Sequence, residues 1–255
     1  MNSTHGPGGE RARWRLVVAM VAALLPACTQ GSAAQGLSLG WQDCRSGPGS
    51  GFGTQAYGCL GNITELPLFP TFVLAAPLDS VYTMELVIDV DVAVDPLPAW
   101  WRMDPGECRA GGWSATGSIT GSCSDPWSGA GVAAAQGWLP GTPGDTTRHG
   151  RLLVAANVLP QAAVALQPNV PYVACRVLLR TNRTDMCDGC QIPACLVFNS
   201  VLIRRLPGSS VEELLLDSPE TPGANWVQWQ GGAGADCQSV PVRRRTWGAV
   251  KALYR

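Results

Sequence analysis

The chain has 255 residues, of which 15% are charged, and its formal net charge is −1. This near-neutral balance argues against a nucleic-acid-binding protein, which would carry clustered positive charge. The length suffices for one large domain, or for one domain with an appendage.

Residues 1–34 have the features of a signal peptide. Arginines at positions 11, 13 and 15 precede the apolar segment Leu16–Ala27, and small residues run up to Ala34. The apolar segment is shorter than the roughly 20 residues of a membrane span, and none of that length follows. We therefore expect a secreted, cell-surface or periplasmic protein with no transmembrane segment in the mature chain. The alternative is a lipoprotein anchored at Cys28, in the sequence LPAC.

Short apolar runs between turn residues predict an all-β fold. In Met84–Val94 every second residue is apolar, while Asp89, Asp91 and Asp95 share the other face. This period of two predicts a half-buried strand with one apolar side and one solvated acidic side. The other strands that we expect are, in chain order, Leu37–Trp41, Leu68–Ala75, Arg151–Val158, Val170–Arg180 and Leu196–Leu206.

The strands are expected to form an antiparallel β-sandwich over residues 35–206. Residues 96–150 are rich in glycine, serine and tryptophan, which predicts long loops and one short helix around Val132–Gln136. Residues 207–255 form a polar connector and a C-terminal arm that we expect to pack on the sandwich. Thr246 is placed to cap a short C-terminal helix in this arm.

The cysteines are expected to form disulfide bonds, because an exported chain meets no cytosolic reductant. The candidates are Cys44, Cys59, Cys108, Cys123, Cys187, Cys190, Cys195 and Cys237. Short spacing favours the pairs Cys44–Cys59 and Cys108–Cys123. The other four would form two bonds, one of which would anchor the C-terminal arm. Cys175 lies within an expected strand and is left over, so we expect a buried free thiol.

A zinc site and a redox centre are the alternatives for the segment CDGCQIPAC. A structural zinc site usually has two close ligand pairs, and no second C-x-x-C follows. A thioredoxin-like centre requires a βαβ context that this pattern lacks. Disulfide bonding is therefore the favoured interpretation, with no cofactor.

Leu166–Val177 reads LQPNVPYVACRV and resembles the L-x-P-x-x-x-Y stretch of fibronectin type III and immunoglobulin-like domains. The resemblance implies a sandwich in which Tyr172 forms the tyrosine corner. The pieces LSLGWQDC, PAWW followed by Cys108 and Arg109, CDGCQIPACLVFNSV, WQGGAGADC and TWGAVKALYR resemble an uncharacterised family of exported, cysteine-rich bacterial proteins. This second resemblance implies a shared exported β-rich fold and no particular activity.

Three kinds of site can be tested by residue type. A hydrolytic triad would depend on His149, because the other histidine leaves with the signal peptide. Asp89 and Asp91 have the spacing of a paired-carboxylate glycosidase, and Asp95 would join them in a calcium site. A solvated acidic face and an exposed loop histidine are the favoured interpretations of these residues.

Tryptophans are the most suggestive excess, with ten in the chain. Trp100, Trp101, Trp113 and Trp127 would form a carbohydrate- or protein-binding surface if their ring faces were exposed. The favoured interpretation is that they fill the core beneath the loops. We therefore expect a structural or interaction protein without a catalytic site, whose partner is a protein or glycan at the cell surface. A ligand-binding module and a secreted hydrolase are the alternatives.

Overall fold

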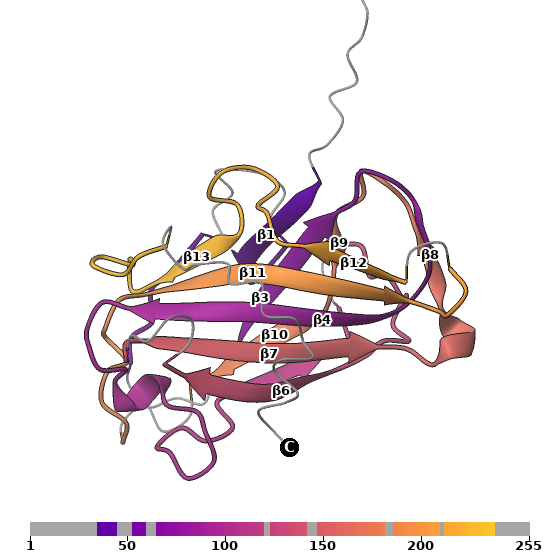
Figure 1. Ribbon diagram of the computed structural model, residues 1–255. Coiled ribbons are helices and arrows are strands. Elements are labelled where there is room, and N and C mark those ends of the chain that lie inside the picture. The colour runs from indigo at the N-terminus through magenta and orange to yellow at the C-terminus, as the bar shows by residue number, and fades with distance from the viewer. Residues whose placement is uncertain are drawn as a thin grey trace, which may run out of the picture. The chain divides into compact units, whose positions relative to one another are not determined.

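In the computed structural model the regular secondary structure is almost entirely β, and its strands form two sheets (Figure 1). It describes residues 35–44, 53–59, 65–119, 123–141, 147–181, 186–209 and 212–237. The expected signal peptide, Cys28 and the helix at Thr246 lie outside these residues. Within them, helical structure is confined to two 3-10 turns, η1 (Ala99–Trp101) and η2 (Pro160–Ala162). No helix in this part of the chain is long and apolar enough to cross a membrane.

The smaller sheet has five antiparallel strands. Its order is β1 (Gly36–Trp41), β3 (Glu65–Val73), β10 (Arg176–Arg180) and β5 (Trp113–Thr116), with β9 (Tyr172–Val173) also paired to β3. The outer edge of β1 is not open, because residues 218–224 bond to it. Leu37 N–H donates to Ser218 O at 2.9 Å, and Leu39 N–H donates to Ala224 O at 2.9 Å.

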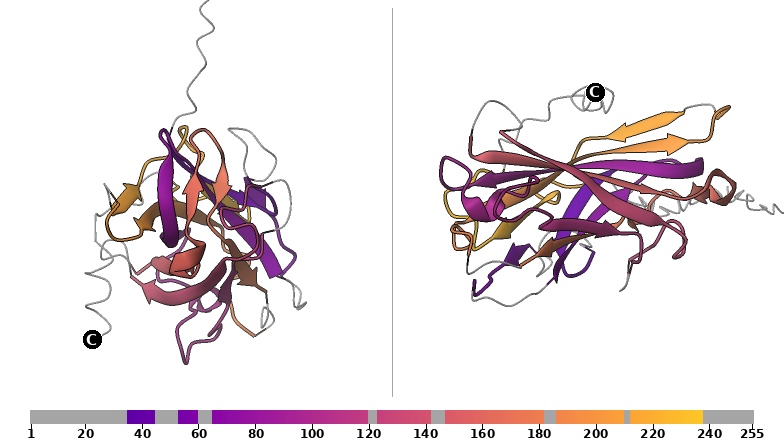
Figure 2. Two further views of the ribbon diagram at one scale, coloured as in Figure 1. Left: turned by 90° about the vertical axis from the view of Figure 1, so that its right-hand side faces the viewer. Right: turned by 90° about the horizontal axis from the view of Figure 1, so that it is seen from below.

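The larger sheet has eight strands. Its order is β2 (Thr54–Gln55), β13 (Trp226–Trp229), β11 (Ala194–Arg205), β4 (Leu78–Val92), β7 (His149–Asn157) and β6 (Val132–Pro140); β12 (Glu213–Leu216) pairs with β11, and β8 (Val164–Leu166) pairs with β4. All of these pairs are antiparallel except β13 with β2. The two sheets lie as separate layers, and the strands of the smaller run obliquely across those of the larger (Figure 2).

One hydrophobic core lies between the sheets. The predicted apolar face of β4 belongs to it, with Met84, Leu86, Ile88, Val90 and Val92 all at most 1% exposed. This confirms that the period of two in the sequence marks a strand with a buried apolar face. The prediction that the strand is only half-buried is wrong, because Asp89 and Asp91 on its other face are also 0% exposed. Leu37, Leu68, Phe72 and Val177 close the core from the smaller sheet.

The predicted helix around Val132–Gln136 is wrong. These residues belong to β6, which pairs with β7 from Val132 opposite Asn157 to Pro140 opposite Gly150. Alanine has the highest intrinsic helix propensity, but such a propensity is small, and pairing with a buried neighbouring strand outweighs it. The expected strand Val170–Arg180 is instead broken into β9 and β10.

The β structure continues beyond Leu206. β12 and β13 both pair with β11, so the residues assigned to the connector contribute two strands to the larger sheet. The hydrogen bond expected of a tyrosine corner is formed, because the Gln167 N–H donates to the Tyr172 hydroxyl at 2.9 Å. This bond fixes the turn that leads into β9.

Candidate functional site

All eight candidate cysteines form disulfides, and Cys175 is the free, buried cysteine among the described residues. The bonds are Cys44–Cys123, Cys59–Cys190, Cys108–Cys187 and Cys195–Cys237. The Cys44–Cys59 and Cys108–Cys123 pairs expected from short spacing are wrong. Chain closure favours near neighbours only weakly, and strand pairing brings distant segments together instead.

The segment CDGCQIPAC, residues 187–195, therefore is not a metal centre. Its three cysteines bond to three different partners, and its Cys195–Cys237 bond anchors the segment after β13, as expected. The second bond expected among the last four candidate cysteines is wrong, because Cys187 and Cys190 pair with Cys108 and Cys59. Among the described residues, one cluster of metal-ligand type occurs, formed by Asp43, Cys44 and Cys123. Its two sulfurs are bonded to each other, so they are not available as thiolate ligands.

Three of the four disulfides meet at one end of the larger sheet, which we call the disulfide-rich end. It consists of the loops 93–112, 186–193 and 230–237. Ala194 at the start of β11 lies opposite Val92 at the end of β4 and Trp229 at the end of β13, so these loops leave the sheet side by side. The end lies on the left in Figure 1.

A contiguous tryptophan cluster fills this end. Trp100 stacks on Trp229 with ring centroids 4.9 Å apart and meets Trp101 edge-on at 4.8 Å. Trp101 then contacts Trp113 at 6.5 Å, and Trp113 contacts Trp138 at 6.2 Å. Edge-to-face and offset contacts of this kind are the favoured geometries of aromatic rings.

The hypothesis of an exposed tryptophan platform is wrong. Trp100 and Trp101 are 0% exposed, Trp113 is 6% exposed and Trp127 is 5% exposed. Trp127 lies outside the cluster contacts and directs its indole N–H at Val81 O, 3.4 Å away. These side chains fill the core beneath the loops, which is the interpretation that the sequence favoured.

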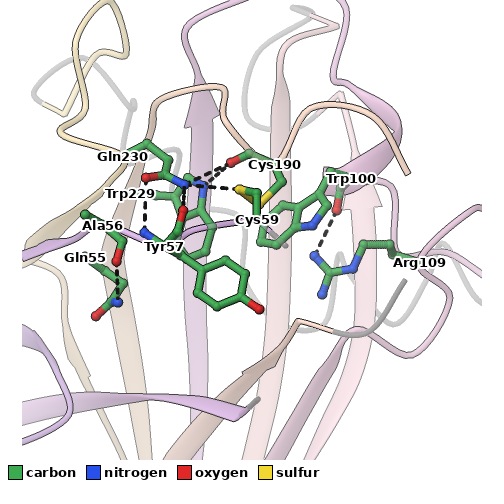
Figure 3. The surroundings of a disulfide bond; sticks show 9 residues. All are labelled: Gln55, Ala56, Tyr57, Cys59, Trp100, Arg109, Cys190, Trp229 and Gln230. Carbon is green, nitrogen blue, oxygen red and sulfur yellow. Dashed lines mark hydrogen bonds between the residues drawn. A yellow bond between two sulfur atoms is a disulfide. The ribbon is translucent and has the colours of Figure 1, made fainter. Parts of the chain in front are cut away.

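Arg109 is buried inside the same cluster (Figure 3). Its guanidinium carbon lies 3.9 Å from the centroid of the Trp100 ring, and Nη1 donates to Trp100 O at 3.2 Å. Burial lowers the pKa of Arg109 to about 9, with Tyr57 acting in the opposite direction. Within the described chain, no acceptor bonds to its Nε or Nη2. The aromatic face of Trp100 is thus its main stabilising contact.

A pocket of about 160 Å³ opens between the turn 103–111 and β6. Its lining includes Met103, Asp104, Trp113, Gln136 and Trp138. Asp104 is the one charged residue among the described residues that line it. Burial and the neighbouring charge of Glu107 raise the pKa of the Asp104 carboxyl.

The acidic face of β4 is not solvated as expected. Asp89 and Asp91 are both 0% exposed. Arg151 Nε and Nη2 donate to the two oxygens of Asp89 at 2.6 and 2.8 Å, and Asn199 also donates to this carboxylate. Burial raises the pKa of Asp89, against the lowering effects of Arg151 and Asn199.

Asp91 has its own partners. His149 bonds to it, Arg148 Nη2 lies 3.0 Å away, and the Asp236 N–H donates to it at 3.0 Å. His149 is a buried strand residue rather than the exposed loop residue that we expected.

Asp95, the third expected calcium ligand, accepts a hydrogen bond from Thr147 instead of joining Asp89 and Asp91. All three carboxylates thus already accept hydrogen bonds from protein donors. This arrangement does not favour a calcium site or a catalytic carboxylate pair.

Several residues of this end were missed from the sequence. Trp229 and Arg109 lie 120 positions apart and meet through Trp100. The pairing of Trp138 with Trp113 depends on the strand β6, part of which was predicted to be a helix. No local pattern identifies Asp104, because a lone acidic residue in a turn is common.

No protein-family model, curated protein sequence or solved structure matches the chain. Compartment therefore has to be inferred from the molecule itself. Four disulfides in one domain indicate an oxidising compartment, since cytosolic thiols are kept reduced.

Proposed function

We propose that this chain is an exported interaction protein, built on an immunoglobulin- or fibronectin type III-like β-sandwich, that acts at or beyond the cell surface. The four disulfides and the hydrogen bond of Tyr172 support this proposal. The signal-like residues 1–34 would direct export, with lipoprotein anchoring at Cys28 as the alternative.

The observation that carries the proposal is the covalently fixed disulfide-rich end. Three disulfides join its loops to one another and to the sheet. Loops at one end of a rigid β scaffold are common binding elements. Fixing them in advance reduces the ordering cost of association. A structural or adhesive contact is therefore the use that this geometry favours.

The hydrolase alternative has less support. His149, the histidine that it requires, is buried and bonded to Asp91. A general base has to reach the proton that it removes from a substrate or nucleophile. His149 is instead buried against a buried carboxylate, where a substrate proton would be hard to reach.

Export is tested with the intact chain expressed in a bacterial host. Mass spectrometry of the mature protein from periplasm or medium should give an N-terminus after Ala34, or a lipidated Cys28. Full-length protein retained in the cytoplasm with reduced thiols would contradict export.

The interaction surface is tested with a photo-cross-linking residue at Met186, which is 73% exposed and next to Cys187. Leu159 is 65% exposed and follows the opposite end of β7, so it serves as the matched control. A discrete cross-linked product on cells from Met186 and not from Leu159 supports the proposal. Equal labelling from both positions contradicts it.

A carbohydrate- or ligand-binding module is the second candidate. The pocket beside Trp113 and Trp138 is the observation in its favour. A glycan array with the parent protein and Trp138→Ala tests the carbohydrate version. Glycan binding lost in the variant would support it, and no binding by the parent protein would count against it.

A further inference from the structure

The pocket at the disulfide-rich end has the size of one small chemical group. Its volume is about 160 Å³. An engineered protein cavity of about 150 Å³ holds one benzene molecule. A single side-chain end or headgroup therefore matches the pocket, whereas a sugar chain is too large to be enclosed.

The walls of the pocket are aromatic and polarisable. Trp113 and Trp138 line it with ring centroids 6.2 Å apart and ring planes inclined by 31°. Met103, Pro105, Ala135 and Leu152 form the rest of the apolar lining. Tryptophan has the strongest attraction for a cation of the aromatic side chains, and thioethers are soft, polarisable contacts.

The charge of the pocket favours a positive occupant. Asp104 is the charged residue of its lining, and among the described residues no hydrogen bond or ion pair uses its carboxylate. The charge of Glu107 acts on Asp104 and, together with burial, raises its pKa. A cation in the pocket would offset the repulsion from Glu107 and favour the charged form of Asp104, while an anion would add to the repulsion.

The tryptophan cluster already holds one cation. The Arg109 guanidinium lies on the Trp100 ring at 3.9 Å, and its Nη1 bonds to the Trp100 carbonyl. Its Nη2 lies close to Gly112, next to the pocket residues Gly111 and Trp113. The same cluster thus stabilises a buried positive charge on its inner side, even though that charge opposes a second cation nearby.

We propose that the pocket between Asp104, Trp113 and Trp138 binds an alkylated ammonium group. This inference deepens the proposed interaction function and rests on it: the ammonium group would belong to the partner, as a methylated lysine side chain or as a choline headgroup. The indole rings supply cation–π attraction, Met103 supplies dispersion contact, and the carboxylate of Asp104 supplies charge.

The experiment uses the mature, disulfide-bonded protein and its intrinsic tryptophan fluorescence. Choline is titrated against 3,3-dimethylbutan-1-ol, which has the same shape without the charge, and against sodium acetate. We expect saturable binding of choline at millimolar concentration, and at least about 5-fold weaker binding of the neutral alcohol. Equal binding of the two, preferential binding of acetate, or no saturable binding of choline overturns the inference.

Variants locate the site. Asp104→Asn and Trp138→Phe should each weaken choline binding by about 3- to 10-fold, while Asp217→Asn, which removes a carboxylate away from the pocket, should leave it unchanged. Near-ultraviolet circular dichroism identifies any variant that fails to fold. If Trp138→Phe does not fold, Asp104→Asn carries the test alone. Equal effects of Asp104→Asn and Asp217→Asn contradict the assignment.

Two further ligands separate the possible sources. Tighter binding of a trimethyl-lysine peptide than of glycerophosphocholine assigns a protein partner, and the reverse assigns a lipid headgroup. The proposed function can survive failure of this inference. If cross-linking from Met186 persists in Asp104→Asn, the proposed interaction function stands. Only the assignment of the pocket to an ammonium group is then wrong.

Discussion

Removing the Cys59–Cys190 disulfide should be the most informative single perturbation of stability. The bond joins residues 131 positions apart, and loop-closure entropy for a chain of this length gives about 5 kcal/mol. Cys108–Cys187 shortens this loop, because the path through that bond contains about 50 residues of chain. With the other bridges intact, the expected loss in the free energy of unfolding of the Cys59→Ala/Cys190→Ala variant is therefore about 4 kcal/mol.

Urea unfolding followed by tryptophan fluorescence measures this loss. With an m-value of about 2–3 kcal/mol/M, the midpoint should fall by roughly 1.3–2 M. Cys175→Ala is the control, because it removes a buried sulfur but no cross-link, and should cost about 1 kcal/mol. A loss in the double variant no larger than that of the control would refute the view that this bond constrains the disulfide-rich end.

Three other predictions follow from buried polar groups. Asp89→Leu should cost about 3–5 kcal/mol of unfolding free energy, because it leaves the Arg151 charge buried without its partner. The double variant Asp89→Leu/Arg151→Met should recover most of this loss. A urea double-mutant cycle of Asp89→Leu and Arg151→Met that shows additive effects would contradict a coupled pair. Tyr172→Phe should cost about 0.5–1.5 kcal/mol by removing the hydrogen bond from the N–H of Gln167, and a midpoint equal to that of the parent protein would show that this bond contributes nothing. Burial raises the pKa of the Cys175 thiol to about 12, so the folded protein should not react with a disulfide reagent at pH 8 and should react once in 6 M urea. Since the unfolded thiol ionises near pH 9 and the folded one does not, the contribution of this group to stability is lost as the pH rises from about 9 towards 12.

The elements predicted correctly are those with a local signal. β4 alternates from Met84 to its end at Val92, and this apolar face is buried as the pattern indicates. The motif around Tyr172 is also local, because the residues that form the hydrogen bond lie five positions apart. β6 was mistaken for a helix because alanine has the highest intrinsic helix propensity, and the pairing with β7 that makes it a strand is not visible within the segment itself.

The features that were missed depend on distant partners. The burial of Asp89 follows from Arg151 and Asn199, on two other strands, and no pattern within β4 reveals them. The pairing of the cysteines likewise depends on segments that are distant in the sequence. The cysteines were correctly assigned to disulfides by compartment and density, whereas the pairs depend on which loops leave the sheet together. The pocket follows from the pairing of β6 with β7 and from the fold of the turn at Asp104.

Peptide mapping of the secreted protein without reduction is the most direct test of the claim that disulfides fix the loops of one end onto a two-sheet core. Proteolysis and mass spectrometry should give cross-linked peptides for Cys44–Cys123, Cys59–Cys190, Cys108–Cys187 and Cys195–Cys237, with Cys175 recovered as a thiol. Recovery of Cys59 and Cys190 as free thiols, or of Cys44 joined to Cys59, would contradict it.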